Sequence, residues 1–84
     1  MKAILILAGP YSSCSATEII WKEVCKDKDI SLTTFDSTQD EGQKLSSKLN
    51  IKSFPALIID NTVIAVGHPD SQSAEKIIFS LIND

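Results

Sequence analysis

Two cysteines are the side chains best suited to covalent chemistry in this 84-residue chain, and they lie eleven positions apart, at Cys14 and Cys25. The segment between them has the apolar spacing of a single helix. At 1.5 Å per residue such a helix would hold the two cysteines about 16 Å apart along its axis. A disulfide requires Cα atoms within about 7 Å of each other. The spacing therefore predicts that the two cysteines do not pair within one chain.

Cys14 is the candidate for a reactive thiol. It follows a Gly-Pro-Tyr-Ser-Ser segment and stands where the first predicted helix begins. Unpaired backbone N–H groups and the positive end of the helix dipole favour the thiolate at such a position. The thiolate is the nucleophile in disulfide exchange. We predict that Cys14 is the catalytic residue and that Tyr11, Ser12 and Ser13 shape its environment and contact a partner. The alternative is that Cys14 is only a small, half-buried side chain.

A strand and a helix are needed to present Cys14. Residues 3–8 form an uninterrupted apolar run, typical of a strand that is covered on both faces. Residues 15–18, Ser-Ala-Thr-Glu, fit a capping box with Ser15 as the N-cap residue. Apolar side chains then recur at helical spacing to about residue 26, and Trp21 among them is expected in the core.

The rest of the chain predicts five further elements. Residues 30–36 favour a strand near an edge of a sheet, and residues 40–49 favour a helix that Gly42 weakens. Two strands, 56–59 and 63–66, flank a short hairpin connection. An amphipathic helix follows from residue 71.

This order, β-α-β-α-β-β-α, indicates one α/β domain over the whole chain. A right-handed crossover makes the first two strands parallel, and the hairpin is antiparallel. The result is a four-stranded mixed sheet with helices on both faces.

A single proline, Pro55, stands directly before the buried run at 56–59. Proline has no backbone donor and belongs at the start of a strand, where the fold often holds it cis. The order of helix, Ile-Lys-Ser-Phe-Pro, strand, turn, strand and Gly67 resembles the C-terminal half of thioredoxin-like proteins. The resemblance implies a thioredoxin-like fold. It also implies that backbone groups of Phe54, with Pro55 and Gly67 nearby, pair with an extended partner peptide.

The chain departs from this family at the redox motif, because the family uses a Cys-x-x-Cys pair and none is present. Two alignments are open. In the first alignment, Cys14 matches the second cysteine and Tyr11 replaces the first. We favour this alignment because it puts Thr17 and the apolar helix residues on core-facing positions. In the second, Cys14 matches the first cysteine and Thr17 replaces the second, as in a monothiol glutaredoxin. Both exclude dithiol reduction by the two-cysteine route.

Three functions follow from the resemblance. The first is an atypical, single-cysteine thioredoxin-like protein that performs thiol–disulfide exchange through Cys14 in cell redox homeostasis. Its partners would be protein thiols or disulfides, with glutathione as a candidate. The second is a redox-inactive thioredoxin-fold module that binds proteins. The third, an iron–sulfur cluster bridging two copies through Cys14, is disfavoured because the chain has no arginine to hold glutathione.

Composition and charge indicate which other kinds of partner are not expected. A net charge of −3 argues against nucleic acid, whose binding depends on basic patches. No apolar run approaches the roughly 20 residues of a membrane span. The apolar run at 3–8 is too short for a signal peptide and is needed as a strand, so we expect a cytoplasmic protein. No cofactor or metal is expected, since His68, a solvated loop residue by its context, has no second ligand at metal spacing.

Overall fold

The computed structural model describes residues 2–8 and 12–82, with the backbone alone at 12–14. The predicted order of strands and helices is confirmed. The elements are β1 (Lys2–Leu7), α1 (Ser12–Asp27), β2 (Ser31–Asp36), α2 (Asp40–Lys48), β3 (Ala56–Ile59), β4 (Thr62–Val66) and α3 (Ser71–Ile82).

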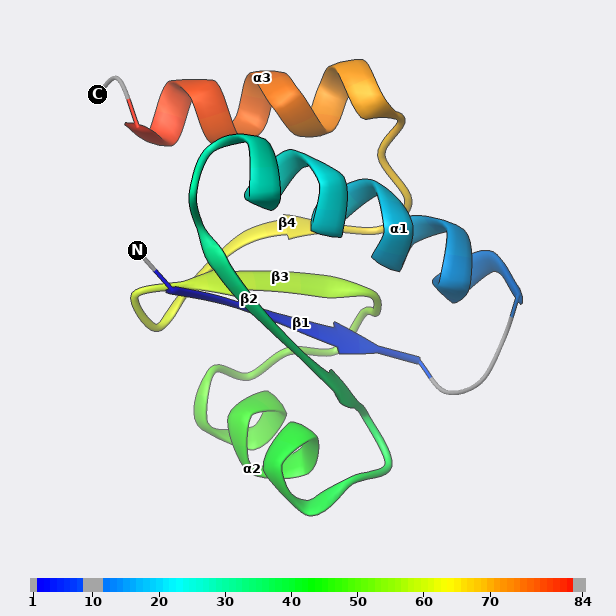
Figure 1. Cartoon of the computed structure of the whole chain (residues 1–84). Coiled ribbons are helices and arrows are strands. Elements are labelled where there is room, and N and C mark those ends of the chain that lie inside the picture. The colour runs from blue at the N-terminus through cyan, green and yellow to red at the C-terminus, as the bar shows by residue number, and fades with distance from the viewer. Residues whose placement is uncertain (1, 9–11, 83–84) are drawn as a thin grey trace.

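The four strands form one mixed sheet in the order β2-β1-β3-β4. Strand β1 pairs with β2 in parallel and with β3 antiparallel, and β3 pairs antiparallel with β4. The second strand is therefore an edge strand, as expected. Helices α1 and α3 cover one face of the sheet and α2 covers the other (Figure 1). In the described part of the chain, no helix has the length and apolar character needed to cross a membrane.

A two-residue turn joins β3 to β4. Asp60 and Asn61 both have positive φ angles, 53° and 60°, as the type I′ turn of a tight hairpin requires. The strand after the turn begins at Thr62, one residue earlier than its apolar run predicts. Further along, Leu57 pairs with Ala65 and Ile58 with Val63, so Ile64 is the extra residue of a β-bulge.

The core lies between the sheet and the helix pair α1 and α3. Trp21 is only 1% exposed, which confirms that it is a core residue. Burial of such apolar side chains is the main stabilising contribution to the fold. The buried cluster consists of Ala3, Leu5, Trp21, Val24, Cys25, Ile30, Leu57, Ile59, Ala74 and Ile78.

Helix α1 begins earlier than the capping box predicts. The expected N-cap residue, Ser15, lies inside the helix, which starts at Ser12. A capping box is a local pattern, whereas the position of this helix depends on what its inner face contacts. Thr17, in the second turn, is buried and bonded to a distant loop. The local pattern at Ser15 was therefore misleading, and the prediction of the helix start was wrong.

Candidate functional site

The start of α1 and two loops lie at one end of the sheet. Ile6 of β1 pairs with Ala56 of β3, which pairs with Val66 of β4. One residue beyond this row, the Gly67 N–H donates a hydrogen bond of 2.8 Å to the Pro55 carbonyl. The N-terminal end of α1 lies at the same end of the sheet (Figure 1). The fold therefore brings the start of α1, the Pro55 loop and the loop after β4 together, and we call this region the sheet end.

Phe54 and Pro55 form the junction before β3. Their peptide bond is cis. The Pro55 side chain is fully buried, whereas Phe54 is half-buried and Ser53 is exposed. The segment thus anchors itself through the proline ring and leaves part of the preceding residue at the surface.

Gly67 turns the chain away from β4. Its φ angle is +97°, a conformation that side-chain-bearing residues rarely adopt. A Cβ atom built there would meet no atom within 4 Å. Backbone conformation, and not lack of space, is therefore the reason for a glycine at this position.

His68 is bound to α1 by a side-chain hydrogen bond. Its Nδ1 lies 2.6 Å from Oγ1 of Thr17, which is only 2% exposed. The imidazole is exposed, as the sequence predicts for a loop residue, but it is also held against the helix. Sequence reasoning missed this contact because 51 positions separate the two residues and neither has a motif that identifies the other.

The position of Cys14 is described by its backbone. It is the third residue of α1, among the first four residues, whose N–H groups have no partner within the helix. It precedes Thr17 by three positions, Trp21 by seven and Cys25 by eleven. At 3.6 residues per turn these positions share one face. The backbone of Cys14 is thus about one turn before that of Thr17, towards the N-terminal end of α1.

The other predicted contact residues of this segment are only partly covered by the structure. Tyr11 and the side chains of Ser12 and Ser13 lie outside the described residues. Their predicted contacts with a partner therefore stay predictions. Of the predicted partner-binding residues, Phe54, Pro55 and Gly67 are brought together at the sheet end.

Cys25 is a buried, free thiol in the third-last position of α1. It is 1% exposed, and this burial raises the pKa of the thiol because the charged thiolate loses its hydration. A thiol that is both inaccessible and protonated is a poor nucleophile. Cys25 and Cys14 also lie on one continuous helix, which keeps them too far apart for an internal disulfide.

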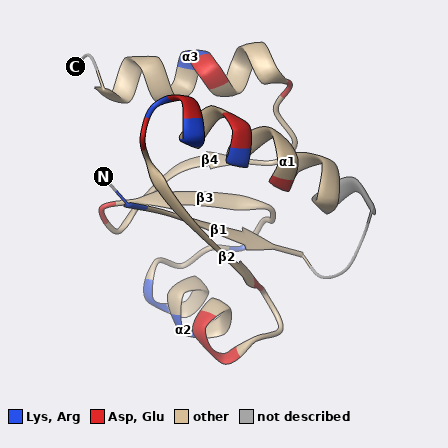
Figure 2. Ribbon diagram, in the orientation of Figure 1, with Lys and Arg blue, Asp and Glu red and all other residues tan. Residues whose placement is uncertain are grey.

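Many of the charged residues lie on α1 and α2. Figure 2 shows Lys, Asp and Glu gathered at the C-terminal end of α1 and on α2. Near the start of α1, Glu18 lies with its Oε2 3.4 Å from Nζ of Lys22 one turn later. Among the described residues, no group of three or more His, Cys, Asp or Glu side chains could hold a metal ion.

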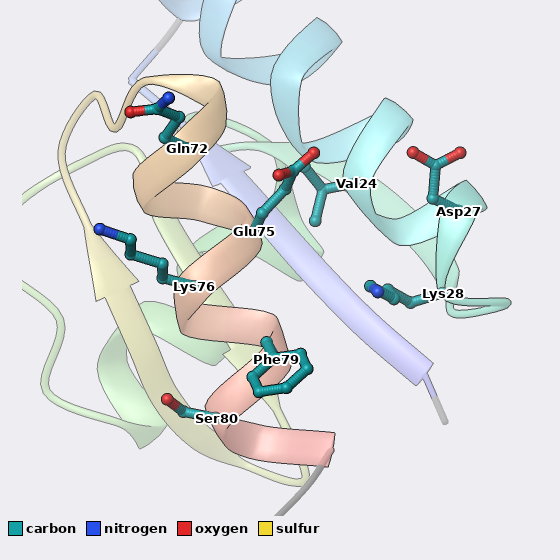
Figure 3. A pocket seen from close by; sticks show the side chains of 8 residues that line it. All are labelled: Val24, Asp27, Lys28, Gln72, Glu75, Lys76, Phe79 and Ser80. Atoms are coloured by element: carbon teal, nitrogen blue, oxygen red, sulfur yellow. The ribbon is translucent and has the colours of Figure 1, made fainter.

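A groove of about 670 Å³ lies elsewhere, between the C-terminal half of α1 and α3 (Figure 3). It contains no cysteine or histidine, and side chains of both charges surround its apolar residues. The groove offers no thiol or imidazole, so the sheet end is the better candidate for thiol chemistry. The groove is lined by Val24, Asp27, Lys28, Gln72, Glu75, Lys76, Phe79 and Ser80.

Comparison with known proteins identifies the family and similar folds. The sequence model of a family described as thioredoxin domain matches residues 2–79. Among solved structures, thioredoxin 1 from the thermophilic eubacterium Thermosipho africanus TCF52B is similar, with a TM-score of 0.74 and 19% identity over 99% of this chain and 96% of that chain. A malarial protein is also similar, with a TM-score of 0.69 and 21% identity over 94% of this chain and 93% of that one. At these identities the structures show a shared fold. No curated protein matches the chain.

Proposed function

The chain belongs to the thioredoxin-domain family, and on that premise we propose that it is a single-cysteine member that performs thiol–disulfide exchange through Cys14. One observation carries the proposal: the backbone of Cys14 is in the first turn of α1, and this end of the helix lies at the sheet end. Unpaired N–H groups in that turn favour negative charge on sulfur. The only other cysteine is buried and has a raised thiol pKa, so it cannot take this role.

The reaction is an exchange without a net oxidant. The Cys14 thiol loses its proton, and its sulfur attacks one sulfur of a partner disulfide, R–S–S–R′. The Cys14–S–S–R bond forms as the S–S bond of the partner breaks, and the leaving R′–S⁻ takes up a proton. A second thiol, R″–SH, then attacks the mixed disulfide, giving R–S–S–R″ and restoring the Cys14 thiol. An external thiol is needed because Cys25 is eleven residues away on the same helix.

The start of α1 supports the first of the two family alignments. The second alignment depended on Ser15 as the N-cap residue, and the helix begins at Ser12 instead. In the favoured alignment Tyr11 stands where the family has its first cysteine. Cys14 then corresponds to the second cysteine and acts alone.

Protein disulfides are the partners that the sheet end supports best. An extended peptide could pair with the backbone of Phe54, the half-buried residue before Pro55, by addition of a strand. Glutathione would depend on cationic groups for its carboxylates. The chain has no arginine, and four of its eight lysines lie on α1 or α2, at positions 22, 26, 44 and 48.

A second function, a redox-inactive module that binds proteins, is favoured by one observation. The backbone position of Cys14 is in helical phase with Trp21 and Cys25, which are both 1% exposed. A thiol at an inward position can be too shielded to attack a disulfide. This function would use the same Phe54 surface without the chemistry.

Mixed-disulfide formation with glutathione disulfide, followed by mass spectrometry of the intact protein, tests the exchange proposal. We expect the parent and the Cys25→Ser variant to form the adduct, and the Cys14→Ser variant to form none. The reaction rate of the Cys25→Ser variant with iodoacetamide should follow an apparent pKa below about 8.5. A slow reaction of Cys14 with iodoacetamide that rises only at alkaline pH, or equal labelling of both single variants, would contradict exchange and favour the binding module.

A further inference from the structure

The groove between α1 and α3 is a surface that the proposed thiol chemistry does not use. It has a volume of about 670 Å³, and its apolar lining consists of Val24 and Phe79 (Figure 3). Val24 is 4% exposed, whereas Phe79 is 57% exposed. Ile82 is three residues after Phe79, and therefore beside it on the surface of α3, and is 42% exposed. Exposed apolar side chains that lie together beside a groove are typical of a docking surface.

The charged side chains of the groove form one acid–base pair on each wall. Asp27 and Lys28 stand at the C-terminal end of α1, and Glu75 and Lys76 lie in the middle of α3. All four are exposed, and within the described part of the chain none of them forms an ion pair. The groove therefore carries no net charge, although the whole chain has a net charge of −3.

We propose that this groove is the interface of a reversible homodimer, in which a second copy of the chain docks across a two-fold axis. An axis that runs along the groove exchanges its two walls, so the α1 wall of each copy faces the α3 wall of the other. The acid and base on one wall then meet the base and acid on the opposite wall. Phe79 of each copy is covered by the other copy.

The balance of charge favours a second copy over other partners. Nucleic acid and anionic membranes bind surfaces with a surplus of basic side chains, and a basic peptide binds a surplus of acidic ones. The groove has neither surplus. Charges of both signs on both walls are instead complementary to an identical surface, and such complementarity determines which partner is accepted.

The size of the surface predicts a weak dimer. Helix α3 has 12 residues and is about 18 Å long at 1.5 Å per residue, and two adjacent helices are about 20 Å wide. The footprint on each copy is then about 360 Å², compared with about 800 Å² for each partner in a standard stable complex. We therefore expect a dissociation constant between roughly 10 µM and 1 mM.

The groove and the sheet end are at different places on the molecule. The groove lies along the C-terminal half of α1, whereas the sheet end lies at the N-terminal end of the same helix (Figure 1). Docking in the groove leaves the Phe54 surface open. The homodimer therefore does not depend on the exchange function, and either proposal can fail without the other.

Sedimentation equilibrium of the full chain from about 5 µM to 1 mM measures the dissociation constant, with a reductant present to prevent disulfides between copies. Asp27→Lys makes the α1 wall wholly basic, and Lys76→Glu makes the α3 wall wholly acidic. We expect either variant alone to raise the dissociation constant at least about tenfold, because like charges then face each other. An equimolar mixture of the two variants should associate again, since the basic wall of one meets the acidic wall of the other.

Lys44→Glu is the matched control, at an exposed position of α2 on the other face of the sheet. It changes the net charge of the chain as Lys76→Glu does, but far from the groove, and should change the dissociation constant by less than about twofold. Phe79→Ala should raise the dissociation constant at least about tenfold, because it removes the central aromatic contact. Thermal unfolding establishes that each variant is folded.

Several results would overturn the homodimer. A parent chain that remains monomeric at about 1 mM has no such interface. A dimer that neither Asp27→Lys nor Lys76→Glu weakens must use another surface. Equal weakening by Lys44→Glu would mean that overall charge, and not the groove, controls association. Failure of the mixed variants to associate would show that the two walls do not face each other.

Discussion

Gly42 has the opposite role from the one that its helix propensity suggests. Its presence in α2 predicts a weaker helix, but the residue is buried against the end of β2. A Cβ atom there would overlap the Asp36 carbonyl oxygen and lie 3.4 Å from the Cα of Ser37. Glycine therefore allows α2 to approach the backbone at the end of β2, and this contact outweighs the loss of helix propensity.

Replacement of Gly42 by alanine should destabilise the protein, although alanine is the better helix former. Overlap with backbone atoms forces α2 to move, and overpacking of this kind costs about 1–3 kcal/mol. Urea unfolding, compared with Ser47→Ala at an exposed position of the same helix, measures the difference. A Gly42→Ala protein as stable as the parent would show that α2 can shift at no cost.

Among the elements, α3 shows how an exposed side chain sets the start of a helix. The Asp70 side chain accepts the Ser73 N–H at 2.8 Å, and its backbone carbonyl accepts the Ala74 N–H at 3.0 Å. The hydrogen bond to the Ser73 backbone lowers the pKa of the Asp70 carboxyl, because it favours the charged form. The cap is therefore strongest when Asp70 is ionised.

The stability contributed by Asp70 should depend on pH with a defined sign. A carboxyl whose pKa is lowered by folding stabilises the protein at pH values above its pKa in the unfolded chain, which is near 3.8 for Asp70. That stability is lost as the pH falls through the folded value. Asp70→Asn keeps a capping oxygen but cannot titrate, so its melting temperature should fall less on acidification than that of the parent. Asp70→Ala should melt lower than the parent at neutral pH. Parallel acid profiles for the parent and Asp70→Asn would contradict this.

At the scale of the whole molecule, stability depends on the core that the sheet forms with the helices packed on one of its faces. Leu5 and Leu57, from the two central strands, and Ile78 from α3 are all fully buried. The adjacent residue of α3, Phe79, is 57% exposed beside the groove. Neighbouring apolar side chains on one helix thus have very different environments, which provides a matched comparison.

Ile78→Ala should lower the free energy of unfolding by about 2–5 kcal/mol, since it removes buried methyl groups and leaves a cavity. Phe79→Ala removes a larger side chain but should cost less than about 1 kcal/mol, because that ring remains mostly in water when the protein is folded. Chemical denaturation of the two variants measures both values. A larger loss for Phe79→Ala would mean that the groove contributes more than the core position.

Much of the architecture was predictable from local pattern. The apolar run at 3–8 identified β1, and the segment ending in Pro55 identified the start of β3, because the requirements of a buried strand and of proline are local. The edge position of β2 and the core position of Trp21 followed in the same way. Local pattern failed at Ser15, where a good capping sequence lies inside a helix.

Part of the candidate site likewise follows from local pattern, and part depends on tertiary packing. The family, the order of elements and the loss of the Cys-x-x-Cys pair could all be predicted from the sequence, since they depend on residue identity and short-range spacing. The start of α1 at Ser12 and the bond between Thr17 and His68 could be found only in the folded protein. The β3–β4 hairpin must first return the chain to the sheet end before these two residues can meet. No pattern within a few residues of either one carries that information, because the contact depends on how the sheet and α1 pack together.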